Sequence, residues 1–122
     1  MTEGEFTEIV DAVVAALPGE FRERMADIAV IVRDEPSPEL LREARLRKGD
    51  ILFGFFRGAP LPDTSFFDLP RLPGQIFIFR LALERAFPDR ENLAAEIRKT
   101  ILHELGHYFG MSEKELRRMG YG

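Results

Sequence analysis

Apolar residues recur at helical spacing in two long segments of the chain. Over residues 5–17 they fall on one face of a helix, and Pro18-Gly19 ends the pattern. The signal is stronger over residues 90–109, where apolar residues follow one another at intervals of four: Leu93, Ile97, Ile101 and Leu105. Asp89 is placed to cap the start of this second helix, and Gly110 is placed to end it.

Three short segments rich in β-branched and aromatic residues predict strands, over residues 27–33, 51–57 and 75–80. We expect the first of them to be a buried strand. A short helix is predicted over residues 38–47, closed by Gly49. A last short helix is predicted after Ser112, a candidate N-cap with Glu115 three residues later.

Residues 58–74, between the second and third strands, contain four prolines, a density that excludes a helix or a central strand. A loop of this length is uncommon in a small domain and is often functional. Phe66 and Phe67, in its middle, either fill the core or line a substrate cleft. The order of elements predicts one α+β domain over residues 1–122, with a small mixed sheet of about three to four strands packed by helices.

Composition narrows the class of protein. Of the 122 residues, 45% are hydrophobic and 31% are charged, a balance typical of one globular domain. The absence of cysteine excludes disulfides, cysteine-based metal sites and a cysteine nucleophile. The longest apolar run, residues 12–17, is far shorter than the roughly 20 residues that span a membrane. The acidic start lacks a signal-peptide pattern, so we expect a soluble cytoplasmic protein with no membrane partner.

The net charge of −4 disfavours nucleic acid as the main partner, because phosphate binding needs a concentrated basic face. One basic stretch has a spacing that suits one face of the predicted 38–47 helix: Arg42, Arg45, Arg47 and Lys48. We expect this face to be solvated, and a nucleic-acid-binding module built on it is the remotest function considered.

Both histidines of the chain lie in one motif, His103-Glu104-Leu105-Gly106-His107, on the second long helix. Side chains at positions i and i+4 project from one helix face, so two imidazoles there can converge on one zinc ion. Glu104 is placed to take a proton from zinc-activated water and to deliver it to a leaving amine. The helical phase sets both histidines opposite the apolar stripe. It sets Glu104 near the edge of that stripe, where burial would raise its pKa.

A catalytic zinc needs a third protein ligand and an open coordination position. Glu113 and Glu115, which follow His107 closely, are the nearby candidates. Gly110 can adopt the left-handed conformation that turns the chain back toward the metal. Glu96 and Thr100 precede His103 by up to two turns on the same helix face, and they are candidates to orient that histidine.

Together with Gly110 and Glu113 the motif reads H-E-x-x-H-x-x-G-x-x-E, and in this the C-terminal third resembles the active site of metzincin-type zincin metalloproteases. The whole chain resembles a small bacterial family of predicted minimal zincin-like metallopeptidases. The helix over residues 91–109 and the turn after it are the most specific match. The resemblance implies a zinc-dependent hydrolase with His103 and His107 as zinc ligands and Glu104 as general base.

Two positions depart from the metzincin pattern. Glu113 stands where the third histidine is usual, and some relatives use a carboxylate there. Metzincins also carry a methionine turn below the metal, and Met119 is the downstream candidate for it in this chain. Tyr121 is a candidate to stabilise an oxyanion, as a tyrosine does in some metzincins.

We therefore expect a metallopeptidase that uses one Zn²⁺ per chain, held by His103, His107 and Glu113, to hydrolyse peptide bonds in a peptide or protein substrate. An extended peptide is expected to add to one edge of the sheet, and the sequence does not identify the strand. The alternative is a non-catalytic metal-binding or protein-interaction domain that keeps the zincin frame. The sequence specifies no oligomeric state.

Overall fold

The structure is a computed structural model that describes residues 1–58, 74–108 and 110–118, apart from the side chains of Arg24 and Glu113. Its helices are α1 (Glu3–Ala15), α2 (Gly19–Arg24), α3 (Pro38–Glu43), α4 (Arg80–Ala86), α5 (Arg90–Tyr108) and α6 (Glu113–Arg118), and a short 3₁₀ helix, η1 (Met25–Asp27), follows α2. Its strands are β1 (Ile28–Arg33), β2 (Gly54–Arg57) and β3 (Gly74–Phe79).

The three strands form one sheet in the order β1-β3-β2, in which β1 runs parallel and β2 antiparallel to β3. This confirms the predicted α+β class with a small mixed sheet packed by helices. The prediction that the first strand is buried was wrong. In the described part of the chain β1 pairs with β3 alone, and its residues are half-buried or exposed.

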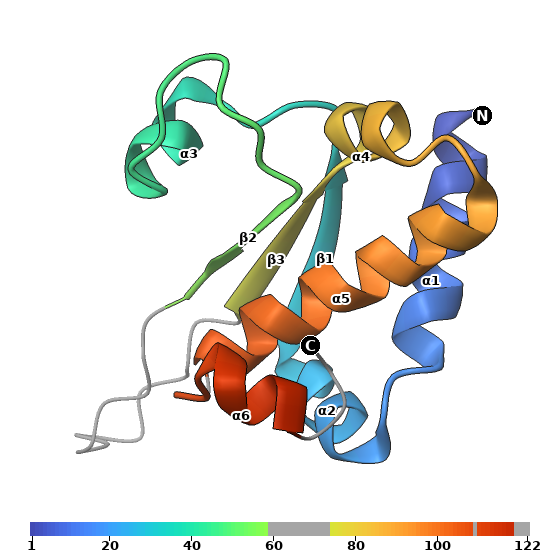
Figure 1. Cartoon of the computed structure of the whole chain (residues 1–122), viewed down its shortest axis with the longest axis vertical. Coiled ribbons are helices and arrows are strands. Elements are labelled where there is room, and N and C mark those ends of the chain that lie inside the picture. Colours follow the sequence, from blue (N-terminus) through green and yellow to red (C-terminus); the bar gives the residue numbers. More distant parts are fainter. Residues whose placement is uncertain (59–73, 109, 119–122) are drawn as a thin grey trace.

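Alternate residues of β3 face two separate cores, as the two-residue period of a strand requires. Ile76 and Ile78 face the larger core, where α5 crosses the sheet and α1 packs on α5 (Figure 1). Phe77 and Phe79 face the smaller one and pack with Leu40 of α3. The helix α5 is therefore held by the sheet on one side and by α1 on another, with its apolar stripe buried between them.

Helix α1 begins earlier than predicted because Thr2 and Glu5 form a capping box. The Thr2 hydroxyl accepts a hydrogen bond from the Glu5 amide at 3.1 Å, and the Glu5 carboxylate accepts one from the Thr2 amide at 3.3 Å. The same carboxylate lies 2.8 Å from Arg90 at the start of α5. These contacts tie the first residues of the chain to α5.

The predicted 38–47 helix is shorter in the structure. Helix α3 ends at Glu43, and Arg45 adopts a left-handed backbone with φ of 59°, which the helix cannot continue through. The basic residues at 45, 47 and 48 therefore do not share a helix face with Arg42, and that prediction was wrong.

Helices α2 and α4 were not predicted. Each is short, and α4 follows β3 without an intervening loop. Arg80, its first residue, lies 2.8 Å from the Asp34 carboxylate and 3.3 Å from that of Glu84, so it ties the end of β1 to α4.

The second predicted strand is also shorter than expected, since β2 begins at Gly54 and the Ile51 side chain is 76% exposed. Most of the proline-rich loop, residues 59–73, lies outside the described residues. The two predictions for Phe66 and Phe67 lie there as well.

Helix α6 packs on α5 at a glycine. A Cβ placed on Gly106 would lie 2.7 Å from both terminal carbons of Leu116, which is fully buried. Van der Waals contact between carbons needs about 3.5–4.0 Å, so the absence of a side chain at position 106 lets α6 approach.

We predict that the effect of Gly106→Ala on stability changes sign with the residue at position 116. In the wild type the new methyl group overpacks against Leu116 and costs about 1–3 kcal/mol. In a Leu116→Ala background, itself costing about 2–5 kcal/mol, the clash is gone and alanine's better helix propensity gains up to about 1 kcal/mol. Denaturant unfolding of the four proteins measures the coupling. An equal cost in both backgrounds contradicts the proposed contact.

Candidate metal centre

Helix α5 carries the histidine motif near its C-terminal end. The predicted cap is confirmed, since the Asp89 carboxylate accepts a hydrogen bond from the Asn92 amide at 3.3 Å. The helix runs to Tyr108, and its buried stripe contains the four predicted apolar residues. His103, Glu104 and His107 lie outside that stripe, half-buried or exposed.

The Nε2 atom of His103 is buried without a hydrogen-bond partner, and it is the one such side-chain nitrogen or oxygen in the described part of the chain. Buried polar atoms are rarely left unpaired, because losing the hydrogen bond to water costs free energy. Nε2 is a nitrogen with which imidazole commonly binds zinc. The unpaired atom therefore fits a metal ligand better than a packing residue.

The second imidazole lies close to the first. The ring centroids of His103 and His107 are 6.2 Å apart, and the rings are nearly perpendicular. Two imidazoles that share one zinc at about 2.1 Å per bond have centroids roughly 5 Å apart. His107 is exposed, so rotation of its side chain can supply the difference. The two histidines fit a shared metal ion.

Glu104 is half-buried and tied to a neighbouring strand. Its Oε2 accepts a hydrogen bond from the main-chain amide of Phe56 at 3.0 Å. Burial raises the pKa of Glu104 above its ordinary value of 4.5, while the Phe56 hydrogen bond and the charge of His107 act in the opposite direction. The predicted direction of this pKa shift is confirmed, and a raised pKa suits a group that must take up and release a proton.

Strand β2 lies beside the motif because it contacts three residues of α5 that are four positions apart: Thr100, Glu104 and Tyr108. A Cβ on Gly54 would lie 2.5 Å from Cγ2 of Thr100, so the strand approaches the helix closely there. One helical turn after Thr100, the Glu104 carboxylate accepts the hydrogen bond from the Phe56 amide. One turn after Glu104, the ring of Tyr108 packs on the ring of Phe56, with 4.3 Å between the ring centroids. The roles of Phe56 and Tyr108 were not predicted, because no local pattern links positions 48 residues apart.

The turn after α5 has the predicted form. Gly110 adopts a left-handed backbone with φ of 78°, its amide donates to the His107 carbonyl, and the Met111 amide donates to the Gly106 carbonyl. Ser112 then caps α6 by accepting a hydrogen bond from the Glu115 amide at 3.1 Å. The chain thus folds back on α5 directly after the motif.

This turn makes Glu113 the first residue of α6, but its side chain lies outside the description. The competing candidate, Glu115, is exposed, and its carboxylate accepts a hydrogen bond from the Ser112 hydroxyl at 3.3 Å. Among the side chains that the structure describes, no three of the metal-ligating types gather at one point. The third ligand stays a prediction.

The other residues predicted for the site are Glu96, Thr100, Met119 and Tyr121. Thr100 packs against Gly54, and within the described residues no hydrogen bond joins Thr100 or Glu96 to His103, so their orienting role stays a prediction. Met119 and Tyr121 lie outside the described residues.

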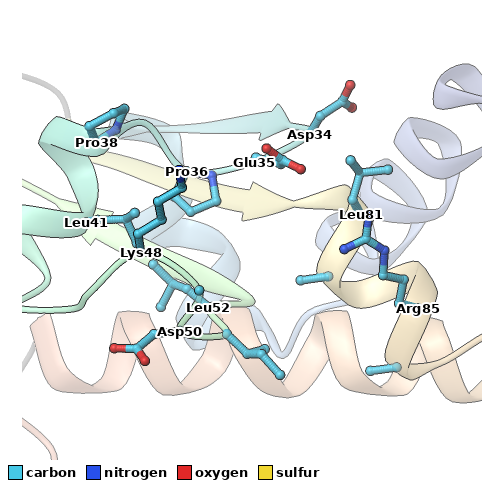
Figure 2. A pocket seen from close by; sticks show the side chains of 14 residues that line it. Asp34, Glu35, Pro36, Pro38, Leu41, Lys48, Asp50, Leu52, Leu81 and Arg85 are labelled. Carbon is cyan, nitrogen blue, oxygen red and sulfur yellow. The ribbon is translucent and has the colours of Figure 1, made fainter.

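A separate cavity of about 790 Å³ lies at the carboxyl ends of β1 and β3 (Figure 2). Pro36, Leu41 and Leu52 line one side of it, and Leu81 and Arg85 of α4 line the other. No residue of the histidine motif lines it, so it belongs to a different part of the surface.

The described site thus combines two histidines four apart on one helix, a half-buried glutamate between them and a small mixed sheet beside them. A model of the zincin-like metallopeptidase family matches residues 25–122. The chain therefore belongs to the zincin-like metallopeptidase family. Comparison with curated proteins gave no match.

Among the described helices, none combines the length and apolar character needed to cross a membrane.

We predict that Glu104→Gln stabilises the metal-free protein at neutral pH. The raised pKa means that the folded state binds the proton more tightly than the unfolded state. The contribution of this carboxyl to stability is therefore complete below pH 4.5 and is lost as the pH rises through the folded-state pKa. Glutamine stays neutral and keeps an oxygen for the Phe56 amide.

Thermal unfolding in the presence of a chelator measures this effect between pH 4 and pH 8. The melting temperature of the variant should exceed that of the wild type at pH 7, and the two should converge at pH 4. A difference that does not change with pH would count against burial as the cause.

Proposed function

We propose that this protein hydrolyses peptide bonds with one Zn²⁺ per chain, held by His103, His107 and Glu113. The observation that carries the proposal is the buried, unpaired Nε2 of His103, one turn from His107 and beside a half-buried glutamate. The family match gives the same class of chemistry. Residues 1–122 act as one domain in this proposal, since α1 lies before the matched region and packs on α5.

A zinc ion held by these residues would supply Lewis-acid polarisation of the scissile carbonyl and of the attacking water. The Glu104 carboxylate takes one proton from the attacking water as the water oxygen bonds to the carbonyl carbon. The carboxylic acid so formed then gives the proton to the leaving amine nitrogen as the carbon–nitrogen bond breaks. The products are one carboxylic acid and one amine, and Glu104 returns to its starting form.

The edge of the sheet beside α5 is the proposed place for the peptide. In the described sheet β2 pairs with β3 on one side, and its other side lies next to the motif. An extended peptide that adds to this side would run past His103 and His107. Main-chain groups of β2 other than the Phe56 amide, which is bonded to Glu104, would hold it with little dependence on its side chains. β1 lies at the opposite edge of the described sheet.

We predict one zinc ion per wild-type chain, measured by mass spectrometry on protein purified without a histidine tag. His107→Ala should lose the metal, because one ligand remains on the helix. Glu113→Gln should retain less zinc after dialysis than Glu115→Gln, a matched variant that keeps the capping geometry at Ser112. The opposite order would move the third ligand to Glu115. A wild type that takes up no zinc when zinc is supplied overturns the proposal.

We predict that Glu104→Gln keeps its zinc and loses hydrolysis of a mixture of quenched fluorescent peptides by a factor of about 10²–10⁴. Glu115→Gln serves as the control for removing a carboxylate near the motif. Turnover at the wild-type rate in the Glu104 variant would contradict the assigned role. A wild type that binds zinc and cleaves no peptide would leave a non-catalytic metal-binding domain.

A further inference from the structure

Two residues of α5 contact the same residue of β2. Glu104 and Tyr108 lie four apart on α5, and both contact Phe56, one through its amide and the other through its ring. The proposed reaction uses Glu104 and leaves Phe56 without a role.

The direction of the Phe56 amide follows from the sheet register. The Phe79 amide donates to the Phe53 carbonyl at 3.0 Å, and Phe55 lies opposite Phe77. Backbone groups alternate in direction along an antiparallel pair, so those of Phe53 and Phe55 face β3 and those of Phe56 face away from it. The Phe56 amide is therefore outside the ladder, and Glu104 is its acceptor.

The Phe56 ring is held on two sides, which fixes the position of that amide. One side is the Tyr108 ring, at 4.3 Å between centroids. On another side the backbone of Gly74 approaches so closely that a Cβ there would lie 2.6 Å from the Phe56 ring. A donor placed this firmly restricts the carboxylate that it binds.

We propose that Phe56 is a positioning residue, whose main-chain amide anchors Oε2 of Glu104 and leaves the second carboxylate oxygen to exchange the proton. This inference rests on the proposed function, since it assigns Glu104 the role of base. It also couples the edge strand to the base, because a shift of β2 moves the anchor of Glu104.

An ester bond at position 56 tests the proposal in the zinc-loaded full chain. Replacing Phe56 with phenyllactic acid keeps the ring and puts an ester oxygen in place of the Phe56 N–H group. The same replacement at Phe55 is the matched control, because both esters disturb the Phe55–Phe77 backbone pair and the control leaves the Glu104 anchor intact. Zinc content, kcat and KM are measured for both with the fluorescent peptide mixture.

The ester at position 56 should lower kcat about 10- to 100-fold, the range seen when an orienting partner is lost. KM should stay within about threefold and zinc content should not change. The ester at position 55 should keep kcat near the wild-type value. Equal kcat values for the two esters overturn the proposal. A loss confined to KM also overturns it, because the amide would then serve the peptide rather than Glu104.

Hydrogen exchange of the Phe56 amide separates failure of this inference from failure of the proposed function. If the wild type cleaves no peptide, the anchor is judged from exchange alone. Protection in the wild type and in Glu104→Gln, with loss of protection in Glu104→Ala, supports it. Equal protection in all three proteins overturns it, whatever the activity.

Discussion

The packing of α5 against β2 is the contact on which the candidate site depends. Thr100 meets the backbone at Gly54, and two turns further on Tyr108 meets the Phe56 ring. Between them a carboxylate enters a half-buried position that would be unfavourable without a donor. The Phe56 amide supplies that donor, so the strand that borders the site also makes the burial of Glu104 possible.

The two ends of the motif are held by different means. His103 and Glu104 are half-buried, while His107 is exposed and close to the end of the helix. Gly106 and Gly110 then let the chain reverse and return as α6, with Leu116 packed where a side chain on Gly106 would otherwise lie. The half-buried His103 side chain and the exposed His107 side chain would suit a pair of metal ligands in which the His107 side chain rotates into place when the metal binds.

The parts of the fold that could be predicted are those with a local signal. The periodicity over residues 90–109, the cap at Asp89 and the left-handed turn at Gly110 each depend on neighbours in sequence, and the structure has them. Helix α4 was missed because no side-chain cap marks its start, although the spacing of Arg80 and Glu84 was a usable signal. The predicted 38–47 helix was too long because no pattern reveals that Arg45 takes a positive φ.

The same limit applies to the site. Two histidines and a glutamate could be found from spacing alone, whereas Phe56 could not, because its contact with Glu104 depends on the sheet register and on how α5 lies against the sheet. The unpaired nitrogen of His103 is likewise a property of its surroundings. The sequence therefore predicts which polar side chains are present, whereas packing decides which of their atoms are buried without a hydrogen-bond partner.

The hydrogen bond at the outer side of β2 also bears on solubility. A sheet edge with unpaired amides invites pairing with another chain, and proteins limit this by placing charged groups along the edge. Glu104 does this at Phe56, so the residue proposed to perform the chemistry also discourages self-association of the strand that would receive a peptide. An inactive variant made to trap substrates should therefore carry glutamine at position 104, because alanine would open the edge to other copies of the protein.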